Sequence, residues 1–242
     1  MSAIRIENLK KEYRDVVAVN GLTLSIEEGE LFSLLGVNGA GKTTTIKMLS
    51  CLVTPSGGDA YLFGKSICND KSDVKSIIAV SPQETAVAPG LTARENLELI
   101  AGVHGFSKEK RSNKINELSE ILGLDGILNR KAGKLSGGWQ RRLSIAMALI
   151  CEPKILFLDE PTLGLDVIAR SDLWEIIRAL KGRITIVLTT HYMEEAEALS
   201  DRIGIMREGK LLICDTAENI KKVAGTDSFE QAFVRIVKGG VE

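Results

Sequence analysis

The chain has 242 residues, with 31 lysines and arginines against 32 aspartates and glutamates, so its formal net charge at pH 7 is -1. This length is enough for one large α/β domain or for a core with a subdomain, and the balanced charge argues against a protein that binds nucleic acid through a basic surface. No run approaches the ~20 apolar residues of a membrane span, and the N-terminus lacks the apolar core of a signal peptide, so we expect a soluble protein.

The four cysteines, Cys51, Cys68, Cys151 and Cys214, are widely spaced and form no C-x-x-C pair. Most lie in apolar runs. We therefore expect reduced, buried thiols in a cytosolic protein, with no disulfide or metal-binding role.

Residues 1–35 are expected to be rich in β-strand. Apolar runs at 4–6, 22–26 and 31–35 predict strands, and Asn20-Gly21 and Glu28-Gly29 predict the turns between them. Tyr13 is an isolated aromatic residue in a charged segment. By pattern alone it is either a strand residue that covers a sheet edge or a surface on which a purine base stacks.

Residues 36–43 read G-V-N-G-A-G-K-T and lie between a strand-like run and a helix-compatible segment. The spacing G-x-x-x-x-G-K-[ST] is typical of a loop whose backbone N–H groups and following helix N-terminus surround a polyphosphate. We expect Lys42 to reach the β- and γ-phosphates and the Thr43 hydroxyl to bind Mg²⁺. The alternative is a glycine-rich turn with an incidental lysine.

Two further strands are predicted at 60–64 and 77–80, and Pro82 ends the second. Gln83 therefore follows the C-terminal end of a strand, where ligands collect in open α/β sheets. A solvent-exposed loop glutamine fits the same pattern.

From residue 84 to about 150 the hydrophobic period becomes helical, which predicts a helical insertion. Thr92 and Glu95 have the spacing of a capping box, and one apolar helical face ends at Gly123. The insertion explains why Asp159 lies so far from Lys42 along the chain. It closes with Leu135-Ser136-Gly137-Gly138-Trp139-Gln140-Arg141-Arg142, in which Ser136 either simply caps the next helix or belongs to a second anion site.

The apolar run 155–158 predicts a buried parallel strand, and it ends in the adjacent acids Asp159 and Glu160. Adjacent carboxylates are costly unless positive charge is near. Asp159 would hold Mg²⁺ through its water shell, and Glu160 would orient or deprotonate an attacking water. A structural role for both acids is the alternative.

A helix with an apolar face should follow Asp166, and the next strand, 184–189, brings His191 to the sheet edge of Gln83 and Glu160. His191 is thus a candidate γ-phosphate contact, although a single histidine is more often structural. Residues 203–206 and 210–214 predict a hairpin around Glu208-Gly209. The segment 216–242 predicts a short helical tail.

In this order the motifs resemble the ATP-binding cassette of ABC transporters over residues 4–215. Residues 36–43 match its Walker A loop, Gln83 its Q-loop, and 135–140 its signature. Residues 155–160 match Walker B, 163–166 the D-loop, and His191 the switch histidine. The signature discriminates this family, because many nucleotide hydrolases share the Walker motifs.

The resemblance implies the α/β fold of a P-loop NTPase cassette: a mixed-sheet core with an N-terminal antiparallel β region and an inserted helical subdomain. Residues 1–83 and 151–215 would form the ATPase core, 84–150 the helical signature subdomain and 216–242 the C-terminal tail.

The resemblance also implies a set of site residues. The catalytic residues would be Glu160, His191 and Gln83, and Mg²⁺ would be held by Thr43, Gln83 and Asp159. ATP would be bound by Tyr13 through stacking on adenine, and by Val19, Gly36, Asn38, Gly39, Ala40, Gly41, Lys42, Thr43, Thr44, Ser136, Gly137, Gly138 and Asp166.

In this family two cassettes pair head to tail, so Ser136 and Gly138 would contact the γ-phosphate bound by the partner's Lys42. The second partner would be a membrane permease, with the cassette on the cytoplasmic face of the cell membrane and ATP hydrolysis coupled to transport. Val37, Trp139 and Gly164 depart from the commonest family residues but remove no catalytic group.

Residues 161–167, 189–197 and 228–233 resemble cassettes of bacterial or archaeal type-two exporters, which predicts outward transport. The alternatives are a soluble cassette ATPase acting on nucleic acid or ribosomes and a P-loop kinase. The former class usually carries paired cassettes, coiled-coil insertions or basic arms, which this chain lacks, so we expect no nucleic-acid partner.

Overall fold

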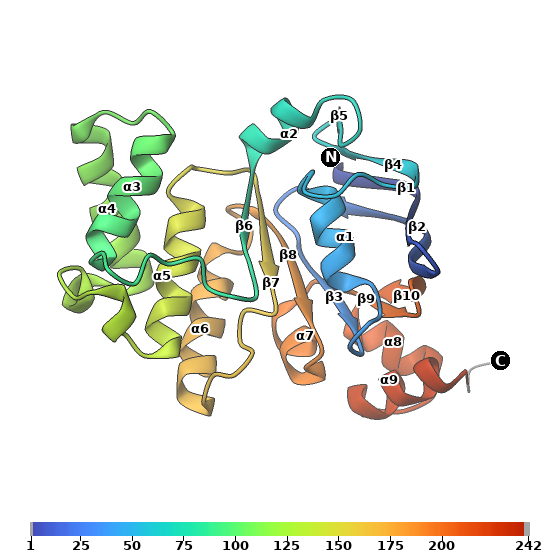
Figure 1. The fold of residues 1–242 in the computed structure, drawn as a ribbon. Coiled ribbons are helices and arrows are strands. Elements are labelled where there is room, and N and C mark those ends of the chain that lie inside the picture. Colours follow the sequence, from blue (N-terminus) through green and yellow to red (C-terminus); the bar gives the residue numbers. More distant parts are fainter. Residues whose placement is uncertain (1, 240–242) are drawn as a thin grey trace.

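The computed structural model describes residues 2–239, which form two β-sheets with helices around them (Figure 1). The N-terminal sheet is antiparallel, with strand order β2-β1-β4-β5. Its strands are β1 (Ser2–Tyr13), β2 (Val16–Glu27), β4 (Gly57–Leu62) and β5 (Lys65–Ser66).

The second sheet has strand order β10-β9-β3-β8-β7-β6. Its neighbouring strands pair in parallel except for the antiparallel hairpin of β9 and β10, so the predicted mixed sheet and the predicted hairpin are both confirmed. Its strands are β3 (Leu31–Gly36), β6 (Ile78–Ser81), β7 (Ile155–Asp159), β8 (Thr185–Thr190), β9 (Arg202–Arg207) and β10 (Lys210–Asp215).

One predicted turn is wrong. Asn20-Gly21 lies inside β2, and β1 and β2 are joined instead at residues 14–15, where Arg14 has φ 47°. Leu9 pairs with Leu22 whereas Lys10 pairs with Asn20, so Gly21 is the extra residue of a β-bulge. Its φ of 73° suits glycine, which explains why a turn-like dipeptide occurs within a strand.

Helix α1 (Lys42–Leu49) lies between the two sheets, and the sheets and helix share one hydrophobic core. Phe157 of β7 points into this core, whereas the adjacent Leu156 and Leu158 point into a second core on the opposite face. This alternation follows from the two-residue period of a strand. It makes β7 buried on both faces, as its uninterrupted apolar sequence predicts.

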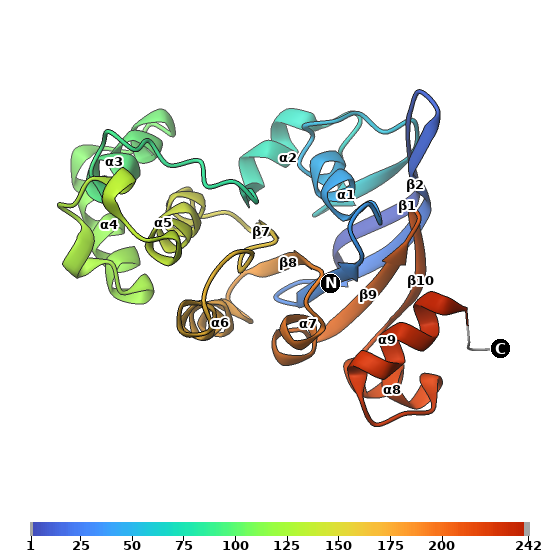
Figure 2. The same ribbon diagram turned by 60° about the horizontal axis from the view of Figure 1, so that its bottom comes forward.

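The second core contains the predicted helical insertion, which lies beyond the edge strand β6, away from the antiparallel sheet (Figures 1 and 2). The capping box is present at the start of α3, and Gly123, with φ 66°, ends α4. The insertion consists of α3 (Ala93–Val103), α4 (Lys108–Leu122), the 3-10 turns Asp125–Ile127 and Ala132–Lys134, and α5 (Gly137–Leu149). Outside it lie α2 (Lys71–Ile77), α6 (Val167–Leu180) and α7 (Met193–Leu199).

The predicted tail is helical over α8 (Ala217–Ala224) and α9 (Phe229–Lys238), and its last residues, 240–242, lie outside the described part. A third core joins these helices to α7, β9 and Leu35 of β3 (Figure 2). Within residues 2–239 no helix is both long and apolar enough to cross a membrane.

The four cysteines are free, as expected, but they are half-buried rather than buried. Partial burial raises the pKa of each thiol, so the thiolate fraction at neutral pH is small.

Because β7 is packed on both faces, truncating Phe157 should be costly. We expect Phe157→Ala to lower the free energy of unfolding by about 3–5 kcal/mol, through lost burial and the cavity that remains. Urea denaturation followed by circular dichroism measures this change. Val223→Ala, at a side chain that is 53% exposed on α8, serves as the control and should shift stability by no more than about 0.5 kcal/mol. Equal effects of the two changes would contradict the described core.

Candidate functional site

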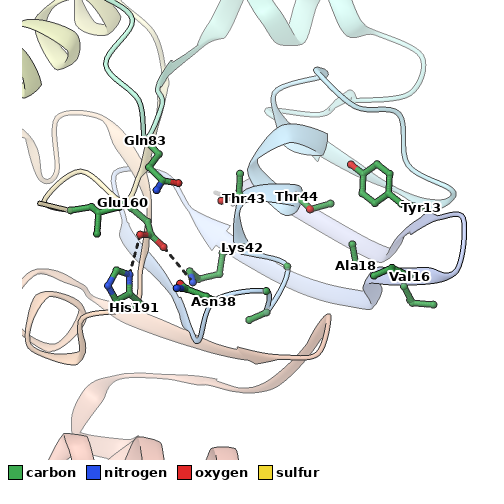
Figure 3. Close-up of a pocket in the computed structure, with 15 residues that line it drawn as sticks. Tyr13, Val16, Ala18, Asn38, Lys42, Thr43, Thr44, Gln83, Glu160 and His191 are labelled. Atoms are coloured by element: carbon green, nitrogen blue, oxygen red, sulfur yellow. Dashed lines mark hydrogen bonds and ion pairs between the residues drawn. The ribbon is translucent and has the colours of Figure 1, made fainter.

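An open pocket of about 590 Å³ lies where the loop after β3 meets the ends of β6, β7 and β8. Figure 3 shows Lys42, Thr43 and Thr44 at its centre, Glu160 and His191 on one side, and Tyr13 at the far end. Gln83 lies above Glu160 in the same view. The parallel register explains this meeting of distant segments, since the carboxyl ends of the strands share one edge of the sheet.

The loop of residues 36–43 needs glycine at two positions because it packs against backbone. Gly41 has φ 103°, and a Cβ added there would lie 2.4 Å from the carbonyl oxygen of Ala18. A Cβ on Gly36 would lie 2.4 Å from the carbonyl oxygen of Met206. Any side chain would therefore displace the loop from β2 or β9. Asn38, Gly39, Ala40 and Gly41 line the pocket, whereas Gly36 supports the loop from beneath.

The ammonium group of Lys42 is buried within this loop. Its Nζ donates hydrogen bonds to the carbonyl oxygens of Gly36, at 2.7 Å, and Val37, at 3.2 Å. The same atom lies 3.6 Å from Oε1 of Glu160. Burial lowers the pKa of Lys42, and the carboxylates of Glu160 and Asp159 oppose that shift. The pocket thus holds a cation that has few water contacts and is available to anionic oxygens.

Asp159 and Glu160 use their carboxylates differently, although they are adjacent in sequence. Oδ1 of Asp159 accepts hydrogen bonds from Oγ1 of Thr43, at 3.1 Å, and from Oγ1 of Thr189, at 2.5 Å. Oε2 of Glu160 lies 3.0 Å from Nδ1 of His191 (Figure 3). Asp159 therefore faces α1, and Glu160 lies between the lysine and the histidine.

Thr189 is a site residue that the sequence patterns missed. Besides donating to Asp159, it accepts the backbone N–H of Glu160 through both its Oγ1 and its carbonyl oxygen, each at 3.1 Å. It also pairs with Asp159 in the β7–β8 register. The sequence feature that could have identified Thr189 is a hydroxyl residue at the end of an apolar strand, two positions before His191.

The oxygen donors near Thr43 fit Mg²⁺, which prefers hydroxyl, carboxylate and amide oxygens. Thr43 and Asp159 are already in hydrogen-bond contact, and Gln83 lines the same pocket. Within residues 2–239, no group of three or more histidine, cysteine, aspartate or glutamate side chains is arranged to hold a metal ion. A cation here would need further ligands from phosphate and water, which is usual for Mg²⁺.

At the far end of the pocket, Tyr13 is 43% exposed and its ring centroid lies 4.9 Å from Nζ of Lys11. Val16, Val17 and Ala18, the first three residues of β2, line this end, and the sequence patterns missed all three. Val19, which was expected to bind nucleotide, is completely buried, and the pocket is lined by its three predecessors instead.

The signature residues and Asp166 do not line the pocket, whereas Leu163 at the start of the D-loop does. The two motifs lie close to each other, since a Cβ added to Gly137 would lie 3.8 Å from Cδ2 of Leu165. Ser136 is the N-cap residue of α5, but its side chain makes no capping hydrogen bond, which argues against the alternative that it simply caps this helix. A Cβ added to Gly138 would lie 3.0 Å from Cβ of Ala169 on α6. Asp166 caps α6 by accepting the backbone N–H of Ala169 at 2.9 Å.

Ser136, Gly137 and Gly138, which the sequence predicts to form a second anion site, therefore lie outside the pocket of Lys42.

Comparison with known proteins agrees with this geometry. The profile of the family described as ABC transporter matches residues 19–163, which is more than half of the chain. The chain belongs to this family. It is an ATP-binding cassette, so it binds ATP and belongs to the ATPases, as the order of its motifs indicates.

Among its relatives, the cassette is 39% identical to the daunorubicin resistance ATP-binding protein DrrA2 of Streptomyces coeruleorubidus, over 94% of this chain and 71% of that protein. It is 40% identical to human phospholipid-transporting ATPase ABCA3 over 93% of this chain, yet it spans only 13% of that protein's length.

A dimeric, post-hydrolysis structure of the cassette MJ0796 bound to ADP and Pi is similar with a TM-score of 0.79 and 28% identity, covering 88% of this chain and 98% of that one.

The contact of Gly41 with β2 makes the nucleotide loop of this cassette sensitive to a single methyl group. We expect Gly41→Ala to weaken ATP binding at least tenfold, because the loop must move away from the carbonyl of Ala18. Titration with a fluorescent ATP analogue measures this.

The matched control is Gly64→Ala, since Gly64 has φ 80° but open space around its Cβ position. That change should cost about 1 kcal/mol of stability and leave ATP affinity unchanged. Unaltered ATP binding by Gly41→Ala would show that the loop does not depend on this close contact.

Proposed function

We propose that the chain is the ATP-hydrolysing subunit of an ABC exporter, working as a head-to-tail pair of cassettes that drives a separate membrane permease. The observation that carries this proposal is the separation of two anion-binding half-sites on one chain. Lys42 lies in the pocket, whereas Ser136 and Gly137, which are exposed, and the half-buried Gly138 lie outside it, at an α5 N-terminus without a side-chain cap. A second copy brings the two half-sites together, and MJ0796, a similar cassette, is dimeric.

Each pocket residue has a role in this proposal. Lys42 and the backbone N–H groups of residues 38–43 hold the β- and γ-phosphates, and Tyr13 stacks on the adenine. Thr43, Asp159 and Gln83 hold Mg²⁺, which would offset the negative charge of the phosphates. Val19, Gly36 and Asp166 act through the backbone of the loops they support.

Glu160 is the proposed general base. Its carboxylate accepts a proton from the water that attacks the γ-phosphorus, while the bond to the β–γ bridging oxygen breaks and ADP leaves. His191, 3.0 Å from Glu160, orients that carboxylate and contacts the γ-phosphate. In the described structure Lys42 also lies near Glu160. When ATP binds, Lys42 would contact the phosphates instead, and the Glu160 carboxylate could then accept a hydrogen bond from water.

The export direction and the membrane location rest on similarity. Residues 161–167 and 189–197 resemble type-two exporter cassettes, and the relative DrrA2 is named for daunorubicin resistance. We place the subunit on the cytoplasmic face of the cell membrane. Residues 84–150 would move as a helical subdomain against the core of 1–83 and 151–215, with 216–242 as a tail.

Affinity capture of the tagged chain from detergent-solubilised membranes separates this proposal from its alternative. Recovery of an integral membrane protein supports the exporter. Recovery of only ribosomal or nucleic-acid-bound proteins would instead support a soluble cassette ATPase, which the balanced charge and the relatives do not favour.

The proposed base predicts a trapped dimer. We expect Glu160→Gln to bind ATP but to lower kcat by about 10²–10⁴-fold, because the amide cannot accept the proton of water. Size-exclusion chromatography with ATP should then show a dimer. Glu152→Gln, at a surface residue paired with Lys110, is the control and should stay active. Normal hydrolysis by Glu160→Gln would rule out this residue as the base.

Thr189 predicts a second effect. Thr189→Val keeps the shape of the side chain but removes the hydroxyl that donates to Asp159. We expect the Mg²⁺ concentration for half-maximal ATPase activity to rise roughly tenfold or more, as for other partners of metal-binding groups. Thr185→Val, on the same strand but bonded to Gly29, is the control. An unchanged Mg²⁺ dependence would mean that Thr189 does not orient Asp159.

A further inference from the structure

Arg141 is a buried cation on α5 that none of the sequence motifs accounts for. Its side chain is among the least exposed of the charged residues, at 4%. Nη1 donates to the carbonyl oxygen of Pro82 at 2.6 Å, and Nη2 donates to that of Gln83 at 2.5 Å. The guanidinium therefore bonds two consecutive carbonyl groups of the segment from which Gln83 lines the ATP pocket.

Stability alone does not explain this arrangement. Within residues 2–239 Arg141 makes no ion pair, and its buried Nε has no hydrogen-bond partner. Asp159 and Glu195 stabilise its charge only at longer range. Burying a charge without a directly paired carboxylate is costly, and an apolar side chain would usually be cheaper at such a site. What arginine alone supplies is a rigid fork that can bond two carbonyls at once.

A second contact places α5 firmly on the same segment. Oγ of Ser144 lies 3.0 Å from Oγ of Ser81, and both atoms are buried. Ser81, Pro82 and Gln83 are thus all tied to α5, by two side chains that lie three residues apart on the helix. A shift of α5 must therefore move the backbone of Gln83 or break these bonds.

The N-terminus of α5 is the part of the chain that carries the signature. Gly137 and Gly138 form its first turn, and Arg141 follows one turn later. In the proposed dimer this N-terminus meets the ATP held by the partner, whereas Gln83 meets the ATP held by its own chain. Helix α5 is therefore connected to both ATP sites, to the partner's site through its N-terminus and to its own through the bond between Arg141 and Gln83.

We propose that Arg141 is a positioning residue that couples the two ATP sites, by transmitting contact of Ser136–Gly138 with the partner's ATP to Gln83 of its own pocket. This inference rests on the proposed function, because it needs the head-to-tail pair. It predicts that Arg141 affects turnover and cooperativity, while ATP affinity of the single chain depends on Tyr13 and Lys42.

The test uses the purified full chain and two substitutions, Arg141→Met and Arg141→Lys. Methionine removes both hydrogen bonds, and lysine keeps the charge but cannot reproduce the planar fork. We expect kcat to fall about tenfold or more for Arg141→Met and less for Arg141→Lys, with the Hill coefficient for ATP falling toward 1. The Kd of a fluorescent ATP analogue should stay within about twofold of that of the unmodified chain.

The matched control is Arg142→Met. Arg142 is the next residue of α5, but its guanidinium bonds Asp172 at 2.6 Å and lies over the ring of Trp139. It should leave kcat, Kd and the Hill coefficient within about twofold. This control distinguishes the effect of losing the hydrogen bonds to Pro82 and Gln83 from the effect of removing any arginine from α5.

Unchanged kcat and Hill coefficient in folded Arg141→Met and Arg141→Lys would overturn the inference, as would equal losses of kcat and ATP affinity. If Arg141→Met does not fold, Arg141→Lys decides by the same criteria. Failure of the proposed function would be recognised by different results: the unmodified chain would hydrolyse no ATP, or Glu160→Gln would stay monomeric with ATP.

Discussion

The site depends on the parallel pairing of β3, β8 and β7. Leu35 of β3 pairs with Thr190 of β8, and Thr189 of β8 pairs with Asp159 of β7, so the three strands end at the same level. The residues that follow are the phosphate loop, Glu160 and His191, and no flexible segment is needed to collect them. A shift of one strand by a single residue would turn Asp159 to the other face of the sheet and remove it from Thr43.

Much of this could be predicted from sequence because local signals and burial agreed. The strand at 155–158, the capping box at Thr92 and the apolar face of α6 all appear where their patterns indicate. The sequence also predicts that Gln83, Glu160 and His191 share one sheet edge, since each follows a strand, and all three line one pocket. These features have short-range patterns, and the parallel sheet then relates them to one another.

The remainder depends on contacts that no local pattern encodes. Asn20-Gly21 has the composition of a turn, but pairing on both sides makes it a bulge. Thr189 resembles any polar strand end until the register sets it opposite Asp159, and Arg141 looks like a surface arginine of an amphipathic helix. Val19 does not line the pocket because the alternation of side chains along β2 points it into the core. Long-range packing decided each of these cases.

Glu160 has a strained backbone conformation. Its φ is 47°, a left-handed backbone conformation that disfavours side chains other than glycine, and Pro161 follows it directly. Its backbone N–H is nevertheless held by Thr189, which keeps the residue in that conformation. Glycine would relieve the strain but would lack a carboxylate. Under the proposed function the carboxylate is needed for turnover, so stability and activity place opposite demands on this position.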